Sequence, residues 1–253
     1  MNFFKFFRQP KPIIFVGVRM AIDMIQHVAE DCGYKVVGIL DKYYYGNTAQ
    51  VKGIPIIGSE DWLLDSENKQ AQEWLKSHSF ALTSWWDGRQ FLGRHGLDNE
   101  VLRIERTKLL NQANANCPSL IHPSVKFRGR KEKVQIGKGT IIESDCTFGP
   151  NISIGDFCYI DWCVSMYTNV HLQNNVIVGA KANLGEATVK DSCRIGVASL
   201  VAPIGLKQND HIVLGENSVV WMGCHAYKNI PDNHVWTKGD KILKRYEKPN
   251  EEN

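Results

Sequence analysis

The sequence predicts a small α/β unit of Rossmann-like type followed by a left-handed parallel β-helix built from hexapeptide repeats. Two observations lead to this fold class. An apolar residue returns at every sixth position through the middle of the chain, and the stretch before it alternates strand-like runs with helical patterns. The 253 residues are enough for two such units, each with a core of its own.

The hexapeptide repeat begins at Ile136 and has nine consecutive matches. Its apolar positions are Ile136, Ile142, Phe148, Ile154, Ile160, Met166, Leu172, Val178 and Leu184. A six-residue period corresponds to one short strand and one turn, and three of these close a triangular coil that stacks on the next at about 4.8 Å. We expect the apolar residues to point inward, while the glycine or acid that usually follows them takes the corner. After a one-residue deletion the pattern resumes at Val189.

The segment before the repeat reads as a small parallel α/β unit. Buried-strand runs cover 12–18, 34–41, 53–58 and 80–85, and helical spacing covers 21–32, 63–78 and 102–113. This alternation of strands and helices is typical of βαβ units. We place the boundary near Cys117, which predicts a small Rossmann-like domain over residues 1–117 and a β-helix domain with a C-terminal tail over 118–253.

Composition and cysteine usage narrow the function further. The formal charge of +3 is too small to imply a nucleic-acid partner. Seven cysteines without a CxxC pair favour reduced thiols and a cytoplasmic location, and Cys146 and Cys158 fall on small inward positions of the repeat. The apolar run within residues 1–12 is too short for a signal peptide or a membrane-spanning helix.

The chain resembles the bacterial sugar acetyltransferases of the sialic-acid and bacillosamine pathways, over roughly residues 13–246. The landmarks are Gly17 after the first strand, Asp41 after the second, and the motifs GIPIIG, LIHPSV, VLGENSVVWMG and IPDN. The resemblance implies acetyl transfer from acetyl-CoA, as co-substrate, to the amino or hydroxyl group of a sugar, with no tightly bound cofactor. It also implies a homotrimer in which acyl-CoA lies between neighbouring β-helices.

The same resemblance places the nucleotide-linked sugar on the small domain. Its expected ligands are Gly17, Val18, Arg19, Asp41, Lys42 and Gly58. Asp41 suits recognition of a ribose or base because an acid at the end of the second strand accepts hydroxyl hydrogen bonds. Only the first glycine of the family's glycine-rich loop is present here. Arg19 is either a replacement phosphate donor or a solvated loop residue.

The general base departs from the family pattern. The position of the family histidine falls on Thr168 by repeat register, or on Met166 by local similarity, and neither side chain is a base. His171 lies nearest and is the first candidate for the catalytic base. Glu186, which is expected to stack on the same face as Thr168, is the second candidate and could instead orient an attacking amine.

The acyl donor is expected along the later coils. Small residues at Gly179, Gly196, Ala198 and Ala202 would leave room for pantetheine, and Lys238 and Lys241 suit the CoA phosphates. The family's usual GxPA turn is replaced by Thr237 to Lys241, so a solvated basic tail remains an equal alternative.

Two other function classes compete with acyl transfer. A metal hydrolase on the same fold needs three converging histidines, and residues 136–206 contain only His171, so no metal site is expected. A non-catalytic β-helix that binds a sugar nucleotide or scaffolds partners stays open, because the family base is missing. For the trimer we expect exposed apolar side chains at Tyr159, Trp162, Met166 and Tyr167.

Overall fold

The computed structural model describes residues 9–19, 21–83, 94–129, 134–203 and 210–245. The chain divides into two compact units, Met1–Pro118 and Ser119–Asn253, one residue from the boundary expected from the sequence. Among the described residues, no helix combines the length and apolarity needed to cross a bilayer.

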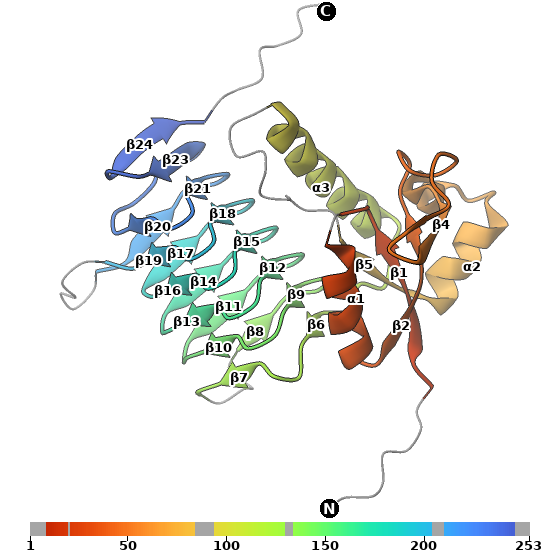
Figure 1. The fold of residues 1–253 in the computed structure, drawn as a ribbon, viewed down its shortest axis with the longest axis horizontal. Helices are drawn as coiled ribbons and strands as arrows, with labels where there is room; N and C mark the ends of the chain where they lie inside the picture. The colour runs from red at the N-terminus through yellow and green to blue at the C-terminus, as the bar shows by residue number, and fades with distance from the viewer. Residues whose placement is uncertain (1–8, 20, 84–93, 130–133, 204–209, 246–253) are drawn as a thin grey trace, which may run out of the picture. The chain divides into compact units, whose positions relative to one another are not determined.

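The first unit contains a mostly parallel sheet in the order β3-β4-β2-β1-β5 (Figure 1). Its strands are β1 (Lys11–Val16), β2 (Tyr34–Leu40), β3 (Gln50–Val51), β4 (Ile54–Gly58) and β5 (Ser79–Leu82). Its helices are α1 (Ile22–Asp31), the short 3₁₀ helix η1 (Glu60–Leu64), α2 (Lys69–Ser77) and α3 (Arg94–Gln112). Only β3 runs antiparallel, beside β4. Because β2 and β5 flank β1 on opposite sides, the strand order reverses at β1, and α1 and α2 lie on opposite sides of the sheet.

One expected helix of the first unit is divided. The helical spacing over 63–78 predicted a continuous helix, whereas the structure has η1 and then α2. The side-chain oxygen of Asn68 accepts a hydrogen bond from the backbone N–H of Ala71 at 3.0 Å and so starts a new helix. The last expected strand ends at Leu82, and residues 84–85 lie outside the described part of the chain.

The second unit is a three-sided parallel β-helix whose coils run from green to blue in Figure 1. The first wall comprises β6 (Leu120–Ile121), β9 (Ile141–Ile142), β12 (Tyr159–Ile160), β15 (Ile177–Val178), β18 (Arg194–Ile195), β21 (Val219–Val220), β23 (His234–Thr237) and β24 (Lys241–Lys244). The second wall comprises β7 (Lys126–Phe127), β10 (Thr147–Phe148), β13 (Ser165–Met166), β16 (Asn183–Leu184), β19 (Leu200–Val201) and β22 (His225–Ala226). The third wall comprises β8 (Gln135–Ile136), β11 (Ile152–Ile154), β14 (Val170–Leu172), β17 (Ala187–Val189) and β20 (Ile212–Leu214).

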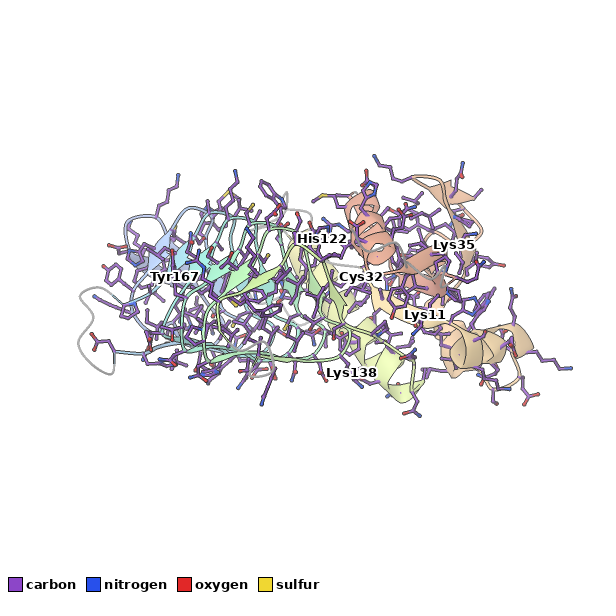
Figure 2. All side chains as sticks on the ribbon, turned by 90° about the horizontal axis from the view of Figure 1, so that it is seen from below. Lys11, Cys32, Lys35, His122, Lys138 and Tyr167 are labelled. Atoms are coloured by element: carbon purple, nitrogen blue, oxygen red, sulfur yellow. The ribbon has the colours of Figure 1, made fainter. Side chains whose placement is uncertain are left out.

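All pairings in this unit are parallel except that of β24 with β23. The arrangement is consistent with the left-handed β-helix that the hexapeptide repeat predicts. The inward positions of the repeat form one continuous core, and the packed side chains can be followed in Figure 2. Nearly all the apolar members of the repeat from Ile142 to Leu184 are at most 3% exposed, which confirms their predicted orientation.

Cys146 and Cys158 are fully buried in this core, as expected from their positions in the repeat. Burial raises the pKa of the Cys146 thiol to about 12, so the thiolate that reacts with alkylating agents is scarce at neutral pH. We expect Cys146 to stay unmodified by iodoacetamide at pH 8 in the native protein and to react after urea is added. Peptide mass mapping would test this, and rapid native modification would contradict the buried placement.

Of the four apolar side chains predicted to be exposed on the β-helix, two are exposed and two are buried. Trp162 and Tyr167 are 36% and 59% exposed, but Met166 and Tyr159 are 1% and 2% exposed. Met166 belongs to the inward positions of the repeat. Tyr159 lies in the outer row of the first wall, and this row is shielded within the chain. The row consists of Ile141, Tyr159, Ile177, Arg194, Val219 and Val235, all less than 9% exposed.

Candidate functional site

The corner between the second and third walls carries the strongest polar constellation of the β-helix. This second–third corner consists of residues 149–151, 167–169 and 185–186, which follow β10, β13 and β16. The first two turns use three residues, whereas the third uses only Gly185 and Glu186, the place of the one-residue deletion seen in the sequence. The backbone N–H of Glu186 donates to the carbonyl of Thr168 at 2.9 Å, and the next N–H donates to the carbonyl of Asn169 at 3.0 Å.

A left-handed backbone directs the side chains at this corner. Asn151, Asn169 and Glu186 have φ values of 57°, 51° and 48°. Asparagine tolerates this conformation, but for most other L-residues it costs about 1–2 kcal/mol. The same left-handed conformation recurs at the corners of successive hexapeptides, for example at Asp145 and Ser192, so the φ of Glu186 follows from the β-helix repeat.

The Glu186 carboxylate is held by a short ladder of amides. Nδ2 of Asn169 donates to both carboxylate oxygens at 3.0 Å. Nδ2 of Asn151 in turn donates to Oδ1 of Asn169 at 2.5 Å. Glu186 and Asn169 are both half-buried. The half-buried carboxylate therefore has a defined direction at the second–third corner.

His171 stands on the third wall, two residues beyond Asn169. It lies in a row of outward side chains with Ser153 below it and Thr188 above it. Its Nδ1 lies 2.9 Å from Oγ of Ser153, and the ring is half-exposed. Because β14 pairs with β17, the two predicted catalytic residues lie on adjacent coils, His171 on β14 and Glu186 in the turn that precedes β17.

A second imidazole, that of His211, joins this group. Nε2 of His211 lies 2.8 Å from Oγ1 of Thr188, and the centroids of the His211 and His171 rings are 6.5 Å apart. His171 lies on β14 and His211 directly precedes β20, so the two histidines are distant in sequence. The signal that could have found His211 is the resumption of the repeat just after it, at Ile212 to Leu214.

The residues predicted to bind acyl-CoA lie at two different corners. Gly179 and Gly196 sit at the first–second corner, where an added Cβ would lie 2.8 Å and 2.4 Å from backbone nitrogens of the next coil. Their lack of a side chain is thus required by coil stacking. Ala198 is exposed at the same corner, and Ala202 follows β19, where its carbonyl lies 3.0 Å from Nε2 of His225. Ala198 and Ala202 therefore flank the short strand β19.

The two predicted lysines lie at the C-terminal end of the β-helix. Lys238 follows β23, Lys241 begins β24, and both are exposed. Arg245, by contrast, donates from Nη1 to the backbone carbonyl of Asn217 at 2.9 Å. The turn between β23 and β24 thus presents the two free-standing basic side chains that the sequence suggested for the CoA phosphates.

The residues predicted to bind a nucleotide sugar meet at the carboxyl edge of the first unit's sheet. Gly17 follows β1 with φ 94°, a conformation suited to glycine. The N–H of Val18 donates to Oδ2 of Asp41 at 2.8 Å, and the N–H of Lys42 donates to Oε2 of Glu60 at 2.6 Å. Gly58 ends β4, where an added Cβ would lie 2.5 Å from the ring of Trp62. Arg19, the remaining member, is half-exposed.

A buried ion-pair network underlies this edge. Arg106 on α3 donates from Nε to Oε1 of Glu60 at 2.7 Å and from Nη2 to Oδ2 of Asp41 at 3.0 Å. The three side chains are 5% exposed or less. Asp41 also accepts hydrogen bonds from the N–H groups of Tyr43 and Tyr44. Its carboxylate therefore organises the loops on either side, and a contact with the nucleotide ribose stays a prediction.

The fold and the two sites define a parallel β-helix of hexapeptide type preceded by a parallel α/β unit. No protein-family model matches the sequence, and no curated protein matches it. Solved structures do. The acetyltransferase domain of PglB from Neisseria gonorrhoeae is similar with a TM-score of 0.71 and 17% identity, over 92% of this chain and 100% of that chain, and a complex of that domain with acetyl coenzyme A matches equally.

Two further solved structures show the same likeness. PerB from Caulobacter crescentus, in complex with CoA and GDP-perosamine, has a TM-score of 0.71 and 17% identity over 92% of this chain and 97% of that chain. WeeI from Acinetobacter baumannii has a TM-score of 0.67 and 14% identity over 92% of this chain and 100% of that chain. These similarities agree with the mostly parallel fold of left-handed β-helix type that the hexapeptide repeat predicts.

Proposed function

We propose that the chain transfers an acetyl group from acetyl-CoA to the amino group of a nucleotide-linked sugar. The observation that carries this proposal is the likeness, over 92% of the chain, to enzymes crystallised with acetyl coenzyme A or with CoA and GDP-perosamine. The group at the second–third corner adds chemical support, because a directed carboxylate and an imidazole suit an amine acceptor. In this proposal the first unit is a Rossmann-like nucleotide-binding domain.

The proposed reaction uses the second–third corner. The Glu186 carboxylate attracts and orients the acceptor amine. The amine nitrogen attacks the thioester carbon and its proton passes to His171. The carbon–sulfur bond then breaks, and the imidazolium returns the proton to the sulfur, which releases CoA as its thiol and leaves an amide. Much of the acceleration comes from holding the two reactants together, since a well-oriented intramolecular reaction can reach an effective concentration of about 10⁵ M or more. The imidazole adds about 10²–10⁴-fold as general base.

The acceptor's nucleotide is proposed to lie at the carboxyl edge of β1 and β2. Ligands of open α/β sheets bind where the strand order reverses, and in this unit it reverses at β1. The loop of Gly17, Val18 and Arg19 borders this point and is tied to Asp41. Lys42, which is exposed and whose Nζ lies 3.8 Å from Oδ2 of Asp61, and Arg19 are proposed to contact the phosphate groups.

The acyl donor is proposed to pass β19, with Ala198 and Ala202 on either side and Lys238 and Lys241 toward the phosphates. Ala198→Trp is expected to weaken CoA binding about tenfold or more, because a large side chain removes the space for pantetheine. Asp145→Trp is the matched control, since Asp145 is also exposed, with φ 60° against 55° for Ala198. Calorimetry with CoA would test both variants, and equal affinities would place the donor elsewhere.

The proposal also includes assembly into a homotrimer, since Trp162 and Tyr167 leave apolar surface exposed on the β-helix. We place the trimer in the cytoplasm. Sedimentation equilibrium checks the assembly, and a mass near that of one chain would argue against it.

The activity is tested with purified protein, acetyl-CoA and a panel of nucleotide-linked amino and hydroxy sugars that includes GDP-perosamine. We expect CoA release only when an amino sugar is present, with the acetylated sugar detected by mass spectrometry. Binding of a nucleotide sugar without turnover would support the non-catalytic alternative. Acetylation of the hydroxy sugars alone would contradict the proposed role of Glu186.

A further inference from the structure

We propose that Asn169 is a positioning residue that holds the Glu186 carboxylate in line for the acceptor amine, an inference that rests on the proposed function. One amide nitrogen, Nδ2 of Asn169, serves both carboxylate oxygens at 3.0 Å. The two carboxylate oxygens lie much closer together than the two N–H bonds of an amide diverge, so one N–H of Asn169 is shared between them as a bifurcated hydrogen bond. The outer lone pairs of the carboxylate remain available to a ligand.

The orientation of the Asn169 amide is set by the ladder beneath it. Nδ2 of Asn151 donates to Oδ1 of Asn169, which leaves Nδ2 of Asn169 facing Glu186. If the Asn169 amide were flipped, two NH₂ groups would face each other on one side and two acceptors on the other. The Asn151 contact therefore gives the ladder one polarity, with donors directed toward the carboxylate.

The contact of Asn169 with Glu186, which we call the clamp, matters because the glutamate side chain is long and that of Glu186 is only half-buried. A free glutamate side chain samples several rotamers, and restricting it before the acceptor arrives removes that entropy cost from binding. Charge-assisted hydrogen bonds such as these are stronger than neutral ones. Asn169 thus prepares the carboxylate without touching the reacting atoms.

Three substitutions test the inference by kinetics. Asn169→Leu removes the donors with a side chain of similar size, and we expect the acceptor KM to rise about tenfold while kcat and the acetyl-CoA KM change less than about twofold. Glu186→Gln should raise the acceptor KM at least as much. The double variant should be no worse than Glu186→Gln alone, because the two residues act as one unit.

Asn169→Asp supplies a readout that a purely structural role would not move. A carboxylate beside Glu186 repels it at neutral pH, so the acceptor KM should be raised at pH 8 and approach that of the wild type as the pH falls and the pair shares a proton. Asn233→Asp is the matched control. Asn233 also has a left-handed backbone, with φ 59°, and accepts a hydrogen bond from Asn217 at 2.7 Å, without a carboxylate partner in that contact.

Thermal melting of the ligand-free protein tests the same inference without measuring activity. Asn169→Asp should lower Tm at pH 8 relative to Asn233→Asp, and Glu186→Gln should restore it in the double variant, because the glutamine NH₂ can donate to Asp. Wild-type kinetics for Asn169→Leu with a raised acceptor KM for Glu186→Gln would overturn the positioning role alone. A normal acceptor KM for Glu186→Gln would overturn both this inference and the proposed role of Glu186. If Glu186→Gln does not restore the Tm of Asn169→Asp, the hydrogen bond between Asn169 and Glu186 is overturned, whatever the activity of the variants.

Discussion

His171→Ala is expected to lower kcat about 100-fold or more with little change in either KM, because a positioned general base contributes about 10²–10⁴-fold in the transition state. The ring is available for this role. Its Nδ1 lies 2.9 Å from Oγ of Ser153, and in the tautomer in which Nδ1 donates to that oxygen Nε2 can take a proton from the acceptor amine. Steady-state kinetics with both substrates varied would measure the split between kcat and KM.

His122→Ala is the matched control for this substitution. His122 is also half-buried, and its Nδ1 lies 2.8 Å from Oγ of Ser124, which reproduces the histidine–serine contact away from the second–third corner. We expect this variant to keep its kcat. If His171→Ala keeps full activity and Glu186→Gln loses it, the base is Glu186. If both variants stay active, positioning of the substrates alone carries the reaction.

Arg106→Met is expected to destabilise the first unit by about 3–5 kcal/mol, since it leaves the carboxylates of Asp41 and Glu60 buried without their cation. The methionine fills most of the space, so the loss measures the missing charge and hydrogen bonds more than a cavity. Urea unfolding followed by circular dichroism would give the change in unfolding free energy. Arg106→Lys keeps the charge but loses the planar guanidinium, whose separate Nε and Nη2 reach the two carboxylates, so its stability should fall between those of the wild type and Arg106→Met.

Lys108→Met controls for the helix itself. Lys108 is exposed on α3, two residues from Arg106, and its replacement should change the free energy of unfolding by less than about 0.5 kcal/mol. Equal stability of the Arg106 and Lys108 variants would contradict the role given to the buried network. A stable Arg106→Met protein with a raised acceptor KM would mean that Arg106 serves the ligand site more than the fold.

The β-helix could be read from the sequence because its period repeats the same inward environment nine times. The period says which side chains point inward, and it should have placed Met166 in the core. It does not say which outward side chains are covered, and for that reason Tyr159 was expected at the surface.

The candidate sites were only partly predictable, for a different reason. His171 and Glu186 could be chosen by residue type and register. Their partners Asn169 and His211 could not be chosen in this way. Asparagine is an ordinary residue at a turn, so Asn169 carries no separate signal, and His211 is far from His171 in the sequence. Arg106 is likewise 65 positions from Asp41 in the sequence, and no local pattern predicts their contact.

The shielded first wall has a consequence for how molecules approach the β-helix. A three-sided body with one side closed keeps a single edge that borders two open sides. That edge is the second–third corner, since the outer rows of the second and third walls are half-exposed or exposed while that of the first wall is buried. A ligand that lies along either open side can therefore reach the edge that carries Glu186, whereas the buried outer row of the first wall offers it no exposed side chain.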